Sequence, residues 1–541
     1  MSPRRKIPTK AELIQLQKIY RTDEKIGEYL GGVPAYLVAY WRRKKNVPRH
    51  SVPKFSEKEI RDLWERFGDD DKCGLELSIS KAAFYNWRRR YGIKEKPAFL
   101  KLEQLELNFP GIKLTRQVET LYGKQTSCQK ILARVAGEEK VEVGQVVKVE
   151  PDLIVTTGTS GLTIQKFKQR GVEYVWNPNK IVISLAGCVF DEPRGDRAAY
   201  KSIREFSRRQ GIKNFYDVRE GFANQIVVEK AHVLPGQLAF GSESHATGFG
   251  CLNATALAVD LDQVVSVWAD GKTELSVPPT IRIEINGRRS RGVYTKDVVL
   301  SMLRQLSAED AAGKAIEFAG SVVSHMNISE RYTLTNVAMD MGARAALAPF
   351  DSITRRYLTG RTNTDYLPVV SDKDAVYDEM YQVNIDQLTP QIFCPGKVNG
   401  VKAVAELEGL PAHQIILGTC TNGRLDDLRI AAEILKGKQV HADCRLVIFP
   451  ASRAVFLEAL KKGLIRVLVE AGAIIMHPGC NTCFGGNADI FAVGSRTLAT
   501  ADGGFLKGGL ALQTETYLCS PATAAASAIN AAITDPTRYV K

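Results

Sequence analysis

The chain has 541 residues, of which 44% are hydrophobic and 25% charged, with ten cysteines and a formal net charge of +13. This length exceeds what one hydrophobic core fills, so we expect three or four domains. No apolar run approaches the roughly 20 residues of a membrane-spanning helix, and the basic start lacks a signal-peptide core. We therefore expect a soluble, cytoplasmic protein without a membrane partner. Ten cysteines in a chain of this length do not indicate a secreted disulfide framework. A spaced pair such as Cys480-x-x-Cys483 is typical of metal binding or redox chemistry.

The positive charge is concentrated near the N-terminus. Residues 1–100 hold 23 Lys and Arg against 13 Asp and Glu, so this stretch carries +10 of the net +13. Such an asymmetry is typical of a protein with a nucleic-acid partner. A solvated basic face would have the same charge, so composition alone leaves both interpretations open.

Two similar segments follow one another in this basic region, at residues 9–48 and 56–97. Each has apolar residues at helical spacing, then a Gly- or Ser-rich turn, then a last helix. The last helices end in the strings Trp41-Arg42-Arg43-Lys44 and Trp87-Arg88-Arg89-Arg90. Each segment predicts the order helix, helix, turn, helix and resembles a helix-turn-helix module used twice. The expected modules are residues 1–50 and 51–97, followed by a linker at 98–114.

The repeated basic strings are candidate DNA contacts. In a helix-turn-helix module the third helix enters the major groove, and basic side chains at its end reach phosphates or base edges. The tryptophans would fill the small cores. A module of this kind could instead dock a protein. If the partner is DNA, bound through residues 1–97, the predicted contacts are Arg42, Arg43, Lys44, Arg88, Arg89 and Arg90.

From about residue 115, short β-branched runs alternate with longer amphipathic stretches, which predicts an α/β body with parallel sheets. The clearest part has strands at 414–417, 445–449 and 473–476, with helices at 425–435 and 453–462. Cys420 follows the first of these strands, and the Cys480/Cys483 pair follows the third. Because ligands bind at the carboxyl edge of parallel strands, we expect the three cysteines to converge.

Three converging cysteines are compatible with either of two kinds of metal site. With His477 they could bind zinc as a Cys₃His site. Alternatively, three thiolates could hold an iron–sulfur cubane with one iron left open. The spacing does not separate these alternatives.

Three segments resemble the large subunit of isopropylmalate dehydratase and homoaconitase, in the aconitase family. They are Gly-Thr-Cys-Thr-Asn-Gly-Arg at 418–424, Pro-Gly-Cys-x-x-Cys-x-Gly at 478–485, and the Ser-Pro-Ala segment at 520–527. The resemblance implies a three-domain α/β/α body at 115–541, with its cluster-binding part at about 390–541. It further implies a 4Fe–4S cluster on Cys420, Cys480 and Cys483, with one iron not ligated by cysteine and Asn422 beside it. A small-subunit partner would complete the site for a small carboxylate ligand.

The family's acid–base groups are altered in this chain. Two family His/Asp pairs are replaced by Thr157-Gly158 and Ala186-Gly187, and residues 51–231 contain no histidine that could substitute. Asp502-Gly503-Gly504 replaces an Asn-Arg-Asn segment whose arginine would grip substrate. The family's Asp-Ser-His-Thr motif survives as a variant at residues 243–246. The remaining catalytic candidates are Glu243 and His245, with Asp262 and Asp340 as possible helpers.

Three functions remain open. The first is a DNA-binding regulator whose eroded hydratase site senses its cluster or a small ligand. The alternative is a hydro-lyase large subunit acting on a hydroxy-carboxylic acid such as isopropylmalate, homocitrate or citrate, together with a small subunit. The third is a zinc-bound or metal-free scaffold. Whether the chain is an enzyme stays open, because each lost acid–base group would remove about 10²–10⁴-fold in rate.

Overall fold

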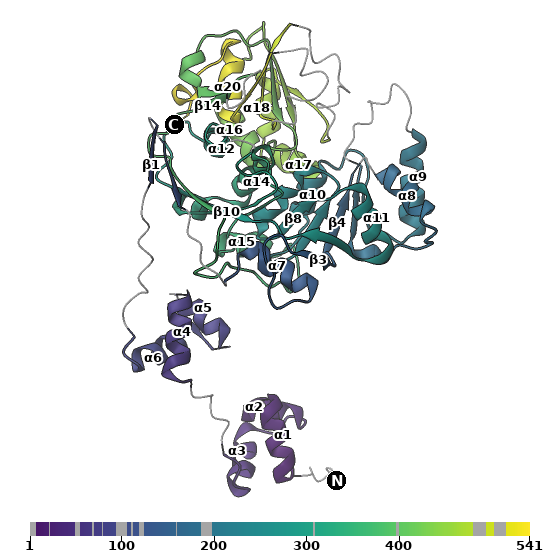
Figure 1. Cartoon of the computed structure of the whole chain (residues 1–541), viewed down its shortest axis with the longest axis vertical. Helices are drawn as coiled ribbons and strands as arrows, with labels where there is room; N and C mark the ends of the chain where they lie inside the picture. The colour runs from purple at the N-terminus through teal and green to yellow at the C-terminus, as the bar shows by residue number, and fades with distance from the viewer. Residues whose placement is uncertain are drawn as a thin grey trace. The chain divides into compact units, whose positions relative to one another are not determined.

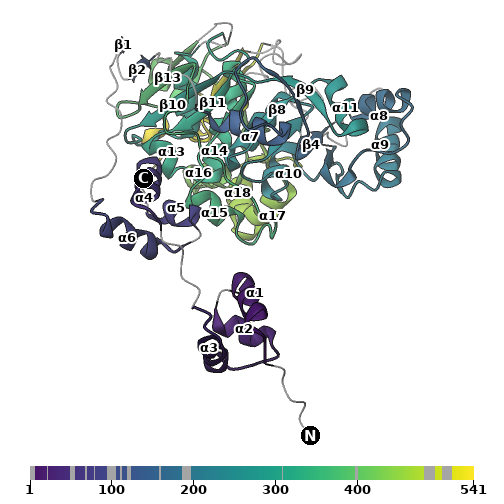
Figure 2. The ribbon, with the colours of Figure 1, turned by 60° about the horizontal axis from the view of Figure 1, so that its bottom comes forward.

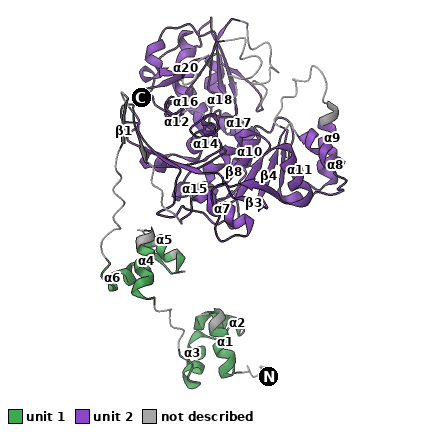
Figure 3. Ribbon diagram, in the orientation of Figure 1, with its two compact units in different colours: residues 1–101 green, residues 102–541 purple. Residues whose placement is uncertain are grey.

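The computed structural model divides into two compact units, Met1–Lys101 and Leu102–Lys541 (Figures 1 and 3). The structure describes residues 7–20, 22–48, 55–67, 70–77, 79–93, 105–109, 112–117, 124–157, 160–185, 197–306, 309–395, 400–479, 494–502 and 515–540.

The first unit contains two triplets of helices, and each triplet has its own small core. Leu13, Ile26 and Trp41 belong to the first core, and Ile60, Trp64 and others to the second. The predicted order of helix, helix, turn, helix is present in both triplets. The helices are α1 (Lys10–Tyr20), α2 (Asp23–Tyr29), α3 (Ala35–Lys44), α4 (Glu57–Phe67), α5 (Asp70–Glu76) and α6 (Lys81–Arg90).

A tight turn joins the second and third helices of each triplet. The backbone N–H of Val33 donates to the carbonyl of Gly27, and that of Ile79 donates to the carbonyl of Gly74, both at 2.8 Å. A Cβ on Gly27 would lie 2.0 Å from the Val33 carbonyl oxygen, and one on Gly74 would lie 2.8 Å from that of Ile79. Glycine is needed at both positions because the backbone of the turn fills the space of a side chain.

The second unit contains a parallel five-stranded sheet of order β6-β5-β4-β7-β8. Alternate residues of its strands face opposite cores. Ile154 and Phe240 pack with α7, α8, α9 and α11, whereas Val155 and Ala239 pack with α10 and the 3₁₀ helix η2. The elements are α7 (Ser127–Ala136), β4 (Leu153–Thr156), α8 (Ser160–Gln169), β5 (Ile181–Ser184), α9 (Arg197–Arg209), β6 (Asn214–Tyr216), α10 (Ala223–Glu229), β7 (Leu238–Gly241), η2 (Ser244–Leu252), β8 (Thr255–Ala258) and α11 (Leu261–Asp270); β3 (Val146–Val149) and β9 (Thr273–Ser276) pair separately.

A six-stranded sheet of order β1-β2-β13-β10-β11-β12 follows in the same unit. Its β1–β2 hairpin overlaps the predicted linker and pairs with β13, so part of that linker joins the body. The elements are β1 (Leu105–Phe109), β2 (Ile112–Gln117), β10 (Thr280–Asn286), α12 (Thr295–Leu303), β11 (Ala315–Ala319), α13 (Ser321–His325), α14 (Ile328–Val337), η3 (Ala338–Met341), β12 (Ala345–Leu347), α15 (Ser352–Leu358) and β13 (Glu379–Asn384).

The third sheet has seven strands in the order β15-β14-β20-β19-β16-β17-β18. Helices α16, α17 and α18 lie side by side (Figure 2). They pack with α20 and one face of this sheet in a single core. The elements are β14 (Gln391–Phe393), β15 (Val401–Ala403), η4 (Val404–Leu407), β16 (Gln414–Gly418), α16 (Leu425–Leu435), β17 (Arg445–Phe449), α17 (Arg453–Lys461), α18 (Leu464–Glu470), β18 (Ile474–Ile475), β19 (Arg496–Ala499), β20 (Glu515–Cys519) and α20 (Pro521–Asn530).

The predicted α/β class with parallel sheets is confirmed, and the predicted strands and helices between residues 414 and 476 agree with β16 to β18 within a few residues. The helix α18 was not predicted, because its short apolar run continues directly from α17. None of the helices in the described ranges is long and apolar enough to cross a bilayer.

Candidate functional site

The loop after β16 carries Cys420 and is folded tightly against the neighbouring strand. Gly418 and Gly423 have φ values of +119° and +97°. A Cβ on either would lie 2.0 or 2.5 Å from the carbonyl oxygen of Phe449, the last residue of β17. Glycine alone allows this approach. Cys420, only 6% exposed, is consequently held at the carboxyl end of β16.

One carboxylate at the start of α16 anchors this loop. Asp427 accepts hydrogen bonds from the side-chain amide of Asn422 at 3.0 Å and from the backbone N–H groups of Gly423 and Arg424 at 2.9 and 3.0 Å. A carboxylate in the first turn also complements the positive end of the helix dipole. The Asn-Gly-Arg segment and its following aspartate therefore form a rigid capping unit that fixes the backbone around Cys420.

Cys420 meets two side chains from distant parts of the sequence. Its thiol donates to Oδ2 of Asp502 at 3.0 Å, and Nε2 of His245 lies 3.5 Å from the same oxygen. The hydroxyl of Thr421 donates to Oδ2 as well, at 3.2 Å. The donor atoms of His245, Cys420 and Asp502 all lie within 4.8 Å of one another. This is the group of possible metal ligands that the described residues bring together.

Three strands deliver these residues. Cys420 follows β16, Asp502 follows β19 of the same sheet, and His245 follows β7 of the five-stranded sheet. Each side chain stands just past the carboxyl end of a parallel strand, the edge at which α/β sheets bind ligands. Cys420 and His245 are predicted site residues. Asp502 is not among them, because it stands where the family resemblance leads us to expect an asparagine.

Helix α14 connects the imidazole to the cysteine loop. The amide nitrogen of Asn336 lies 3.4 Å from Nδ1 of His245. Its amide oxygen lies 3.3 Å from the Thr421 hydroxyl, whose one proton is shared between Asn336 and Asp502. The buried Tyr332 donates to the carbonyl of Cys420 at 3.3 Å, and burial raises the pKa of its phenol. If the Asn336 amide donates to Nδ1, the His245 proton lies on Nε2, facing Asp502.

A buried cation lies behind Asp502 and was not predicted from the sequence. Lys296, at the start of α12, is 2% exposed, and its ammonium donates to the carbonyl of Ala501 at 2.6 Å. Burial lowers the pKa of Lys296, while the charges of Asp340 and Asp502 act to raise it. The lysine thus holds the backbone next to Asp502 in place.

The loop has features that suit a bound inorganic group. Thr419 Oγ1 and Asn422 Oδ1 are buried and have no hydrogen-bond partner within the described part of the chain. Buried polar atoms without partners are costly, so they are rare unless a ligand or water satisfies them. Thiol, imidazole and carboxylate donors together suit a transition metal. Cys480 and Cys483 lie outside the described residues, so Cys420 is the predicted cluster ligand that can be placed.

The other predicted site residues lie apart from this group. Glu243 is half-buried, and its carboxylate accepts from the hydroxyl of Thr157, in the loop where the family resemblance leads us to expect a His-Asp pair. Asp262 is 81% exposed at its side chain and pairs with Lys166 at 2.7 Å on the surface. His477, the alternative zinc ligand, is exposed. Only His245 of the predicted catalytic pair reaches Cys420 in the described structure.

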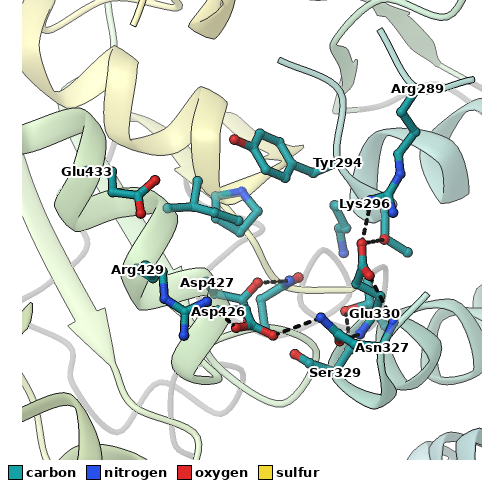
Figure 4. A pocket seen from close by; sticks show the side chains of 15 residues that line it. Arg289, Tyr294, Lys296, Asn327, Ser329, Glu330, Asp426, Asp427, Arg429 and Glu433 are labelled. Carbon is teal, nitrogen blue, oxygen red and sulfur yellow. Dashed lines mark hydrogen bonds and ion pairs between the residues drawn. The ribbon is translucent and has the colours of Figure 1, made fainter. Parts of the chain in front are cut away.

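A cavity of about 330 Å³ opens beside Asn422 (Figure 4). Its charged side chains form ion pairs with one another. Arg289 pairs with Glu330, and Arg429 pairs with Asp426 of the same helix at 2.8 Å. Three cations line the cavity, and four carboxylates do so as well: Arg289, Lys296 and Arg429 against Glu330, Asp426, Asp427 and Glu433. The cavity therefore offers no surplus of positive charge for a carboxylate ligand.

The six predicted DNA contacts divide into two kinds. Arg42 is 6% exposed, and its guanidinium binds the carboxylate of Asp23 through two hydrogen bonds of 2.8 Å. Arg88 binds Asp70 in the same way, at 2.8 and 2.9 Å. These two arginines point into their repeats because an aspartate there accepts both guanidinium donors. The remaining four are exposed: Arg43, Lys44, Arg89 and Arg90.

The chain belongs to the aconitase family. Its residues 187–408 and 397–531 match the family described as aconitate hydratase. It is 41% identical over 417 residues to 3-isopropylmalate dehydratase large subunit 1 of Methanopyrus kandleri, covering 77% of this chain and 100% of that protein. It is 38% identical over 379 residues to the probable methanogen homoaconitase large subunit of Methanosarcina mazei, covering 70% and 96%.

A solved structure, Thermococcus kodakaraensis aconitase X in its holo form, has a TM-score of 0.41 and 14% identity over 73% of this chain and 93% of that one. That likeness is too distant to support an argument. The relatives named above are dehydratase and homoaconitase large subunits. They favour the hydro-lyase alternative over the prediction of a regulator with an eroded site, which the comparisons do not support.

Proposed function

We propose that the chain is the large subunit of an iron–sulfur hydro-lyase that acts on a hydroxy-carboxylic acid of the isopropylmalate or homocitrate class. The observation that carries this proposal is the meeting of Cys420, His245 and Asp502 at the carboxyl ends of parallel strands. The full-length match to a dehydratase large subunit supports it. The names of the relatives as large subunits favour a small-subunit partner.

The proposed cofactor is a 4Fe–4S cluster on Cys420, Cys480 and Cys483, with Asn422 beside it and one iron without a cysteine ligand. Such a cluster would supply a Lewis acid to the substrate hydroxyl. The tight Gly418 and Gly423 turns and the unpartnered oxygens of Thr419 and Asn422 support a bound group at this loop.

His245 is the proposed general acid–base group, because its Nε2 faces the site at 3.5 Å from Asp502. Asp502 holds the imidazole in position for proton transfer. Once Cys420 binds metal as a thiolate it no longer donates a proton, so Thr421 and His245 remain as donors to Asp502. Lys296 holds the Ala501 carbonyl next to this carboxylate. The Glu243 carboxylate accepts a hydrogen bond from Thr157 and makes no hydrogen bond to the described residues of the cysteine loop.

The substrate carboxylates need cations that the described part of this chain does not offer in surplus. The cavity beside Asn422 is lined by more carboxylates than cations, and the family's arginine is replaced in the segment after Asp502. We therefore assign the carboxylate-binding cations to the small subunit. This predicts that the isolated large subunit is inactive even when its cluster is complete.

Anaerobic reconstitution with iron and sulfide tests the cofactor. The full chain should take up about four irons and develop the broad visible absorption of a cubane cluster. Cys420→Ser should abolish both signals, whereas Cys444→Ser should keep them, since Cys444 is an equally buried cysteine (9% against 6% exposed) outside the site. Zinc bound without iron, or equal iron loss in both variants, would refute the proposed cluster.

A hydratase assay tests the reaction. Reconstituted protein, mixed with an isopropylmalate dehydratase small subunit from the same genome, should convert isopropylmalate, homocitrate or citrate to its unsaturated acid, followed by ultraviolet absorption. Omission of the small subunit should remove the activity. A cluster-loaded protein that turns over none of the three acids with its small subunit would refute the hydro-lyase proposal while leaving the cofactor in place.

A further inference from the structure

The third helix of the first repeat presents an exposed stripe of aromatic and basic side chains. Tyr36, Tyr40, Arg43 and Lys44 recur at the spacing of one helical face. Tyr36 is 71% exposed and Tyr40 51%, whereas Val38 on the opposite side is completely buried. Helix α3 contains no acidic residue. The stripe is thus a cationic surface that the core of the repeat does not use.

The second repeat carries an equivalent stripe on α6. Tyr85 is 43% exposed, and Asn86, Arg89 and Arg90 lie exposed beside it, while Phe84 is fully buried. This helix also contains no acidic residue. The basic pair therefore recurs at the same place in both copies of the repeat, with an exposed tyrosine on the same helix, although Tyr85 stands at the position of Ala39.

An internal clamp fixes each stripe. Arg42 ties the end of α3 to Asp23, the first residue of α2, and its third nitrogen donates to the Val47 carbonyl at 3.3 Å. In the second repeat, Arg88 binds Asp70 and donates to the Ile93 carbonyl at 2.8 Å. The aspartates raise the pKa of both guanidiniums. A bidentate ion pair between the second and third helices sets the angle of the third helix.

We infer that the exposed stripes of α3 and α6 are docking surfaces for double-stranded DNA. Arg43, Lys44, Arg89 and Arg90 bind phosphates or base edges, and Arg42 and Arg88 position the two helices. A helix fits the major groove, which is about 12 Å wide, and exposed Tyr and Asn side chains offer hydrogen bonds to base edges. The net charge of +10 in residues 1–100 attracts a polyanion. This inference is independent of the hydro-lyase proposal.

Fluorescence anisotropy of the full chain with a labelled 30-base-pair duplex tests the surface. The affinity should fall steeply with salt, with a slope near −0.9 per phosphate contact on logarithmic axes. Arg43→Glu/Lys44→Glu and Arg89→Glu/Arg90→Glu should each weaken binding at least about tenfold. The matched control, Lys25→Glu/Lys58→Glu, makes the same charge change on exposed positions of α2 and α4 and should have a much smaller effect.

Three results would overturn the inference: equal loss in the control, binding that does not respond to salt, or equal affinity for single-stranded RNA of the same length. Capture of a protein with no duplex binding would assign the stripes to protein docking instead.

A charge swap tests the positioning residue. Arg42→Glu should weaken duplex binding by disturbing α3, and Asp23→Arg/Arg42→Glu should restore it by re-forming the ion pair in reverse. A direct DNA contact by Arg42 would leave the swapped variant as weak as the single one. Circular dichroism of each variant separates weakened binding from an unfolded repeat.

Discussion

Two carboxylates, the half-buried Asp23 in the helical unit and the buried Asp502 in the body, have opposite surroundings. Asp23 accepts two hydrogen bonds of 2.8 Å from one guanidinium, so a permanent positive charge neutralises it. Asp502 is 1% exposed at its side chain, and its Oδ2 is shared by the Cys420 thiol, the Thr421 hydroxyl and the His245 imidazole. None of these three partners carries a permanent charge.

This difference separates a structural ion pair from a chemical site. A carboxylate bound by a bidentate arginine has little left to offer a proton or a metal ion. A carboxylate shared among a thiol, a hydroxyl and an imidazole can exchange protons with them or join them as a ligand. Behind Asp502, Lys296 is bonded to the backbone of Ala501, and burial lowers the pKa of this lysine.

The largest effect should follow from changes at Asp502 and His245. Asp502→Asn and His245→Gln should each lower the hydratase rate of the reconstituted two-subunit enzyme by about 10²–10⁴-fold, because each disturbs the same acid–base pair. Their melting temperatures should change little. Asp262→Asn is the control, since Asp262 is exposed at the surface. A full rate in both variants would make Asp502 merely structural, like Asp23.

The reverse pattern is expected at Asp23. Asp23→Asn should leave hydratase activity unchanged but destabilise the first repeat by about 3 kcal/mol, because Arg42 keeps a buried charge without its anion. Urea unfolding followed by circular dichroism measures this. Glu24→Gln, an exposed neighbour on α2, should change stability by only a few tenths of that value. Equal effects of the two variants would contradict the clamp.

A smaller effect compares the turns of the two repeats. Gly27→Ala should cost about 2 kcal/mol and Gly74→Ala about 1 kcal/mol, because overpacking grows as the new Cβ approaches backbone more closely. The new Cβ would lie 2.0 Å from a carbonyl oxygen of the turn in the first repeat and 2.8 Å in the second. Unfolding of each variant in the full chain measures the difference, and equal losses would mean that the turns relax freely.

A further expected effect is a pH dependence in the body. Burial lowers the pKa of His232 to about 4, so the folded body keeps this imidazole neutral. The unfolded chain binds the proton at the ordinary pKa near 6.5, and stability should therefore fall between pH 6.5 and 4. Calorimetry should show a shallower decline in His232→Gln than in the wild-type chain. Parallel curves would show that His232 does not contribute to the acid sensitivity.

Much of the fold could be predicted because its signals are local. The strand at β16, the glycine loop and the helix α16 follow from apolar spacing and capping residues within about twenty positions. The directions of Arg42 and Arg43 could not be predicted in this way. These neighbours have the same chemistry, and one turns inward only because Asp23 lies opposite it in the folded repeat.

The sequence by itself determined the aconitase-family body, the duplicated basic repeat and the position of Cys420 after a strand, since each depends on a short motif or a local period. Only the tertiary structure decided that Asp502, rather than Glu243, stands with His245 beside Cys420, and that Lys296 lies behind them. The physical reason is distance along the chain. These groups come from separate strands and helices, and their contacts exist only when the sheets bring the strand ends together.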